Sequence, residues 1–93
     1  MAIFVKDPAA AVDYAIDWSA GYLTGQAIEA STWAVLPGGA DAVRIEASAI
    51  AGDETVATIA GGVVGAVYRV TNSVAFSDAR HDERTLTLRV ENR

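Results

Sequence analysis

The chain contains no cysteine, one histidine and one lysine among its 93 residues. Without cysteine it cannot form a disulfide, a thiolate nucleophile or a cysteine-ligated metal site. No stretch approaches the roughly 18 consecutive apolar residues of a membrane-spanning helix. The N-terminus also lacks the basic start and the long apolar region of a signal peptide. We therefore expect a protein that is made in a cytoplasm and remains soluble there.

Acidic residues outnumber basic ones by twelve to seven, which gives a formal net charge of −5. The single lysine is Lys6 and the arginines are scattered, so no basic cluster is available to contact a phosphate backbone. Binding to nucleic acid or to an anionic membrane is not expected. Hydrophobic residues make up 52% of the chain, enough to fill one core, and the length predicts a single domain over residues 1–93.

The dominant pattern is an alternation of apolar and polar residues, which is typical of half-buried strands. It is clearest over residues 12–18, and it recurs over 68–76 and 85–90. In these segments the side chains predicted to face the core are Val12, Tyr14, Ile16, Trp18, Tyr68, Val70, Asn72, Val74, Phe76, Leu86, Leu88 and Val90. A helix would instead distribute the same positions around its circumference.

Weaker alternation predicts four more strands, over residues 3–5, 27–35, 42–49 and 55–60. The first is expected to be an edge strand, because Pro8 follows it and cannot donate a ladder hydrogen bond. In the third, Val43, Ile45 and Ala47 are expected to face inward. Seven short strands separated by turn signals predict an all-β fold, an immunoglobulin- or fibronectin III-like sandwich of about seven antiparallel strands.

The segment 77–84 holds the only histidine and the densest charge. Its acidic residues Asp78, Asp82 and Glu83 lack calcium-loop spacing, and no second histidine could complete a zinc site. The segment is therefore interpreted as a hairpin loop whose charged side chains satisfy its own backbone and each other.

Residues arranged for catalysis are missing from the sequence. There is no nucleophile elbow, and the glycines of 61–65 lack a phosphate-loop lysine. Asp13 and Asp17 would lie on one strand face about 13–14 Å apart, too far for glycoside hydrolysis. We predict no catalytic, cofactor-binding or metal-binding residue, and hence a protein that is not an enzyme.

Three aromatic residues carry structural expectations. Trp18 is in phase with the core positions of its strand and is expected to be buried. Trp33 lies in a strand with imperfect alternation, and if it were exposed it would make a good interface anchor. Tyr68 falls near the start of the sixth strand, where it could form the tyrosine corner of immunoglobulin-like domains or be an ordinary core tyrosine.

Several segments together resemble the small phage proteins called fiber–tail adaptors. The first half of the resemblance is carried by Lys6-Asp7-Pro8, Asp13-Tyr14-Ala15-Ile16-Asp17-Trp18 and Ser31-Thr32-Trp33. The second half is carried by Tyr68-Arg69-Val70-Thr71-Asn72, Ser77-Asp78-Ala79-Arg80-His81-Asp82-Glu83-Arg84 and Leu86-Thr87-Leu88-Arg89-Val90. The family usually has a glycine near Ala79 and a threonine near His81, so the chain departs from the pattern at this loop.

The resemblance implies an immunoglobulin-like virion component that joins the tail, neck or collar of a tailed bacteriophage or prophage to its fibres. It implies other virion proteins as partners, with repeated copies in a symmetric ring, and a location in the virion after synthesis in the bacterial host cytoplasm. It transfers no catalytic residue. The residues hypothesised to contact neighbouring subunits are Phe4, Val5, Trp33, Asp78, Arg80, Asp82 and Arg84.

One alternative from a different functional class is kept. An immunoglobulin-like decoration domain could bind a glycan or protein on the host surface. That function would need an exposed aromatic residue, such as Trp33 or Tyr22, over a polar groove.

Overall fold

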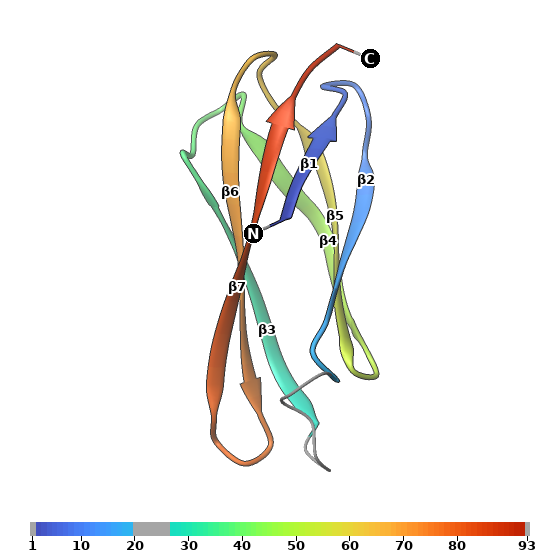
Figure 1. The fold of residues 1–93 in the computed structure, drawn as a ribbon, viewed down its shortest axis with the longest axis vertical. Helices are drawn as coiled ribbons and strands as arrows, with labels where there is room; N and C mark the ends of the chain where they lie inside the picture. Colours follow the sequence, from blue (N-terminus) through green and yellow to red (C-terminus); the bar gives the residue numbers. More distant parts are fainter. Residues whose placement is uncertain (1, 20–26, 93) are drawn as a thin grey trace.

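The computed structural model describes residues 2–19 and 27–92, which form seven strands in two packed sheets (Figure 1). The strands are β1 (Ala2–Lys6), β2 (Val12–Asp17), β3 (Ile28–Leu36), β4 (Val43–Ala51), β5 (Glu54–Gly61), β6 (Val67–Phe76) and β7 (His81–Val90). The four-stranded sheet has the order β1-β7-β6-β3, and the three-stranded sheet has the order β2-β5-β4. The predicted all-β sandwich is confirmed. Within the described residues, no helix is long and apolar enough to cross a membrane.

The strand order is consistent with an immunoglobulin-like sandwich. The β2-β5-β4 sheet follows the order of strands B, E and D of a constant-type domain, and β3-β6-β7 follows C, F and G. The first strand differs from the expectation of antiparallel strands, because β1 pairs with β7 in parallel. Parallel neighbours require a long connection, and here nearly the whole domain lies between the two strands.

Side chains from both sheets fill one core. Every core position predicted from β2, β6 and β7 except Val12 is buried, and Val12 is partly buried against the core. One prediction in β4 is wrong: Ala47 is exposed. A β-bulge between Ile45 and Ala47 shifts the register, and a shift of one residue moves the following side chains to the opposite face.

A chain of buried hydrogen bonds crosses from one sheet to the other. The Trp18 indole Nε1 donates to Thr55 Oγ1 at 3.0 Å, and the Thr55 hydroxyl donates to Asn72 Oδ1. Asn72 Nδ2 in turn donates to Ser31 Oγ at 2.8 Å and to the Thr32 carbonyl at 3.0 Å. Trp18, Thr55 and Asn72 have no exposed surface. These bonds link β5 of one sheet to β6 and β3 of the other.

Tyr68 forms a tyrosine corner. Its ring is buried near the start of β6, and its hydroxyl accepts a hydrogen bond from the Val63 backbone N–H at 3.1 Å. The bond returns to the connection that enters the strand, as in immunoglobulin-like domains. Of the two possibilities left open by the sequence, the corner is the correct one.

The only lysine fastens β1 to the other sheet. Lys6 is 1% exposed, and its Nζ donates to the carbonyl oxygens of Asp7 and Gly61, each at 2.8 Å. Burial lowers the pKa of the Lys6 ammonium below its ordinary value, and the charge of Asp7 opposes this effect. Gly61 ends β5, so the side chain bridges the two sheets at the end of the sandwich where the connection to β6 begins.

We expect Thr55→Val to lower the free energy of unfolding by about 2–4 kcal/mol, because it leaves the buried Trp18 Nε1 and a buried Asn72 group without their partner. Chemical denaturation of both proteins measures the change. Thr58→Val is the matched control on the same strand, since the Thr58 hydroxyl bonds Asp13 at an exposed position. Equal losses in the two variants would contradict a special role for the buried chain of bonds.

Candidate interaction surface

The β6–β7 hairpin is longer and its loop shorter than the sequence indicated. Strand β7 begins at His81, so residues 81–84 are paired with β6 rather than looped. The Phe76 N–H donates to the Arg80 carbonyl at 2.8 Å and closes the loop over residues 77–80. Dense charge suggested a loop, but a strand also accommodates it here, since His81 and Glu83 are exposed and Asp82 and Arg84 are half-buried.

The tip of this hairpin carries an ion pair. Arg80 Nε lies 2.7 Å from Asp78 Oδ2, and the Arg80 N–H donates to Asp78 Oδ1 at 3.2 Å. This agrees with the interpretation of a loop whose charged groups satisfy each other. Between them Ala79 adopts φ 72°, a left-handed conformation that favours glycine. The turn thus favours glycine, the residue type that the family resemblance led us to expect near this position.

Asp82 and Arg84 lie on β7 rather than at the tip. The Asp82 carboxylate accepts the Glu83 N–H at 2.7 Å. Arg84 covers the core: its guanidinium carbon is 4.6 Å from the Trp18 ring centroid, and its Nη1 donates to the Asp17 carbonyl at 2.9 Å. Arg84 therefore supports the fold, through a cation–π contact and a bond to β2.

The side chains of Phe4 and Val5 point to opposite faces of their sheet, because successive residues of a strand alternate. The Phe4 ring points toward the other sheet and packs edge-on against Tyr14, with ring centroids 5.3 Å apart. It and Arg84 line a hollow of about 470 Å³ between β2 and the β1–β7 edge. Val5, the next residue, points to the outer face of the four-stranded sheet and is 39% exposed.

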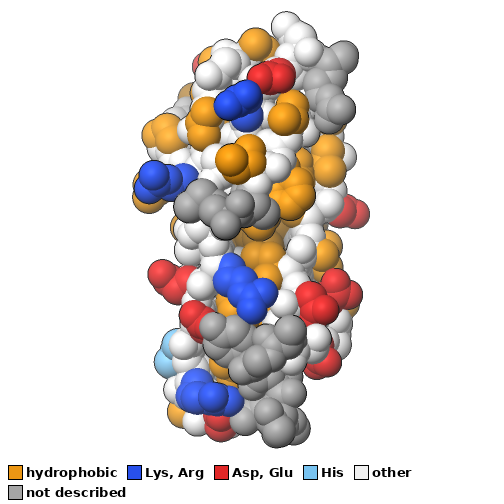
Figure 2. Space-filling view, in the orientation of Figure 1, with side chains coloured by type: hydrophobic (Ala, Val, Ile, Leu, Met, Phe, Trp, Pro, Cys, Tyr) orange, Lys and Arg blue, Asp and Glu red, His pale blue; other side chains and the backbone are white. Residues whose placement is uncertain are grey.

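The outer face of that sheet carries an apolar and basic patch. The register aligns two neighbouring rows, Leu36–Arg69–Thr87–Ile3 and Val67–Arg89–Val5. We call Ile3, Val5, Leu36, Val67, Arg69 and Arg89 the outer patch; its four hydrophobic members are 39–68% exposed. In Figure 2 hydrophobic side chains gather over the upper half of the molecule, Lys and Arg side chains lie in both halves, and most acidic ones in view lie lower.

Sequence reasoning found only Val5 of this patch. Leu36, Val67 and the two arginines come from β3, β6 and β7, and each is unremarkable within its own strand. Only the pairing of strands brings them together. The available signal was that Leu36 and Val67 are large apolar residues at outward positions of their strands.

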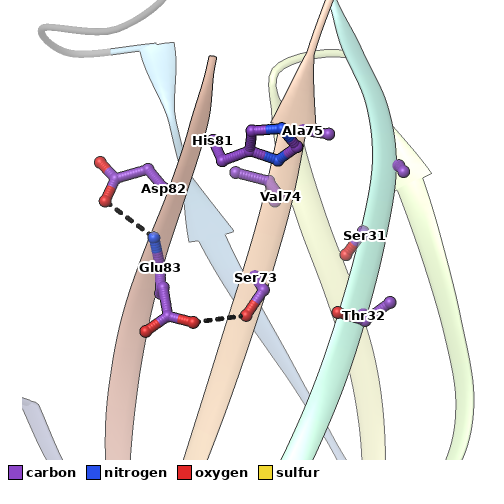
Figure 3. A pocket seen from close by; sticks show the side chains of 9 residues that line it. Ser31, Thr32, Ser73, Val74, Ala75, His81, Asp82 and Glu83 are labelled. Atoms are coloured by element: carbon purple, nitrogen blue, oxygen red, sulfur yellow. Dashed lines mark hydrogen bonds between the residues drawn. The ribbon is translucent and has the colours of Figure 1, made fainter. Parts of the chain in front are cut away.

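A shallow hollow of about 580 Å³ lies lower on the same face, over β3, β6 and β7. Figure 3 shows its polar wall, where the Ser73 hydroxyl donates to Glu83 Oε2 at 2.9 Å. The lining residues are Ala30, Ser31, Thr32, Ser73, Val74, Ala75, His81, Asp82 and Glu83, with no aromatic ring to stack on a sugar. Among the residues that the structure describes, no three or more His, Cys, Asp or Glu side chains gather as a metal site.

Trp33 is not a surface platform. Its side chain is half-buried and packs against the core from the β3 edge, on the same face of the sheet as its register partner Asn72. Its indole Nε1 is buried without a hydrogen-bond partner in the described part of the chain. Tyr22, the other aromatic residue considered for glycan binding, lies outside the described residues.

These features define a β-sandwich that presents apolar and charged side chains on its surface. The family model described as Podophage GP4 fiber-tail adaptor protein gp77 matches residues 6–89. The chain therefore belongs to this family of phage structural proteins, and the resemblance noted from the sequence is confirmed. A comparison with curated proteins gave no match.

We expect Ala79→Gly to raise the free energy of unfolding by about 1 kcal/mol, because glycine relieves the left-handed strain at φ 72°. Thermal and urea unfolding measure the change. Ala34→Gly, at an exposed strand position, is the control and should lower stability by about 0.5–1 kcal/mol. A loss of stability at both positions would contradict a strained turn.

Proposed function

We propose that the chain is a structural virion protein of a tailed bacteriophage or prophage, an adaptor that joins the tail or neck to fibres through protein–protein contacts. Family membership over residues 6–89 supports this role. The observation that carries it in the structure is the outer patch. Large apolar side chains that gather on an exposed sheet face mark a surface that another protein covers.

The chemistry of the patch suggests its partner. Arg89 lies between Val67 and Val5 in its row, and Arg69 lies next to Leu36 in the other. Arg89 is also 3.4 Å from the carboxylate of Glu91. A complementary surface would bring apolar side chains against Ile3, Val5, Leu36 and Val67 and acidic groups against the two arginines, because interfaces match charge with opposite charge. A neighbouring virion subunit of that character would fit the upper half of this face.

The shape of the molecule suits a connector. It measures 42 × 21 × 21 Å, and the outer patch and the Asp78–Arg80 tip lie toward opposite ends of its long axis (Figure 1). A domain with contact groups at both ends can hold two neighbours apart. Copies of such a domain can be repeated around the axis of a tail, in the ring that the family resemblance implied.

In particles assembled with Ile3→Lys, we expect at least about a tenfold fall in fibre attachment, because burying an unpaired charge at the interface costs more than the 1.4 kcal/mol of one decade in affinity. Fibre-bearing particles are counted by electron microscopy. The variant should fold normally, since Ile3 is 65% exposed. Ala15→Lys, exposed on the other sheet, is the matched control. Normal fibre attachment by both variants would remove the outer patch from the proposal.

Replacing Asp78 and Arg80 together by alanine tests the hairpin tip. This exposed pair contributes at most about 1 kcal/mol to stability, so a fall in assembly would report a lost contact with a neighbour. The double alanine variant of Arg44 and Glu46 is the control, because it removes another exposed pair. Assembly is measured as the yield of complete particles. Full yield from the tip variant would limit the contacts to the outer patch.

A further inference from the structure

The second half of β4 is exposed on both of its faces. From Ala47 to Ala51 the strand reads Ala-Ser-Ala-Ile-Ala, and all five residues are exposed. Ile50, the largest of them, is 41% exposed although its register partner Thr55 is fully buried. None of the five carries a charge. In the described part of the chain, this part of the strand has its backbone pairing with β5.

Strand β4 is also the edge of its sheet in the described part of the chain. The Trp18 N–H bonds the Asp53 carbonyl, so by alternation the odd residues of β5 direct their backbone groups to β2 and the even ones to β4. Ala47, Ala49 and Ala51 pair with those even residues. The N–H and C=O groups of Ser48 and Ile50 consequently point to the open edge.

The opposite edge of the same sheet is protected by charge. Strand β2, at the opposite edge of the same sheet, carries Asp13 and Asp17. Strand β3 is largely uncharged, but its inward side chains are half-buried against the core. Natural proteins usually protect long edges with charge, proline or a covering segment, because an unprotected edge pairs with another chain. The stretch Ala47–Ala51 has no charge and no proline, and all five of its residues are exposed among the residues that the structure describes.

We propose that two copies of the chain pair antiparallel through β4, with Ala49 of each copy facing Ala49 of the other across a two-fold axis. Ala47 then lies opposite Ala51 and Ser48 opposite Ile50, so the two three-stranded sheets become one of six strands. Ser48 and Ile50 exchange the backbone hydrogen bonds, and Ala49 forms a pair without them, with Cα atoms about 4.5 Å apart.

Charge favours a second copy as the occupant. The chain carries a net charge of −5, so two copies repel each other unless they meet where neither is charged. In the proposed register all five pairs are uncharged. The same pairing at the β2 edge would place Asp13 opposite Asp17, and like charges directly opposite each other destabilise a sheet.

The pair is expected to be weak in solution. Five paired residues bury less than the roughly 1,000 Å² of a stable interface. Held side by side in an assembly, two copies would reach a high effective concentration and the contact would persist. The inference does not depend on the adaptor role, because the contact is a property of the chain alone.

Cysteine cross-linking of the purified chain tests the pairing cleanly, because the chain has no cysteine of its own. Ala49→Cys places two thiols at the proposed axis, and Ala15→Cys is the matched control. Both alanines are exposed, and they are the two register partners of Val56, one on each side. Under mild oxidation the Ala49→Cys dimer should form at least about tenfold faster than the Ala15→Cys dimer, as effective concentration dictates.

Equal rates for the two cysteine variants would overturn the proposal. The two cysteine variants can also be mixed. If they cross-link to each other as fast as Ala49→Cys cross-links to itself, the proposal is overturned in favour of a head-to-tail contact. Ser48→Pro in the Ala49→Cys chain should reduce cross-linking to the control rate with the melting temperature unchanged, since the Ser48 N–H faces the open edge. Undiminished cross-linking in that folded variant would exclude strand pairing. None of these results bears on fibre attachment, so the two proposals fail separately.

Discussion

The hydrogen bonds from Trp18 through Thr55 and Asn72 to β3 are the constraint on which the sandwich depends. They run through the core, where an unpaired donor or acceptor costs more than a paired one contributes. Each partner must therefore stay within bonding distance, and this fixes the position of one sheet over the other. Apolar contacts are not directional, so apolar packing alone would restrict sliding of one sheet over the other less than these hydrogen bonds do. In a chain without disulfides, this set of bonds performs the task of a cross-link between sheets.

Because these buried hydrogen bonds hold the two sheets together, the side chains on the surface are not needed to position one sheet over the other. Arg84 covers the tryptophan from outside, and Lys6 and Tyr68 secure the end where the connections converge. The outer patch lies on strands that these contacts already hold, and the charged hairpin tip lies in the short loop that joins two of them. Side chains presented on rigid elements lose little entropy on binding, which suits the adaptor role proposed above.

Much of the fold could be predicted from alternation, and the reason is visible in β2, β6 and β7. Tyr14, Ile16, Val70 and Leu88 belong to strands whose apolar and polar residues alternate without interruption, so the sequence of each strand indicates its buried face. Where the period breaks, prediction failed: the bulge after Ile45 turned Ala47 outward. The parallel pairing of β1 could not be inferred, because a strand's own sequence does not state the direction of its neighbour. The outer patch was missed for a related reason, since its members meet only after four strands pair. Arg84 was assigned to a loop because the local charge density gives no information on its contact with Trp18, which lies 66 positions earlier in the chain.

The parallel β1–β7 pair has a mechanical consequence. Five register pairs, from Ala2↔Leu86 to Lys6↔Val90, join the two strands, which point in the same direction. Tension that draws the beginning of β1 and the end of β7 apart acts along both strands, so their mutual hydrogen bonds are loaded together in shear rather than opened one by one. The Lys6 side chain, tied to Gly61 in the opposite sheet, lies at the far end of this ladder and resists the same displacement. A domain built this way withstands stretching along its length better than peeling from its side.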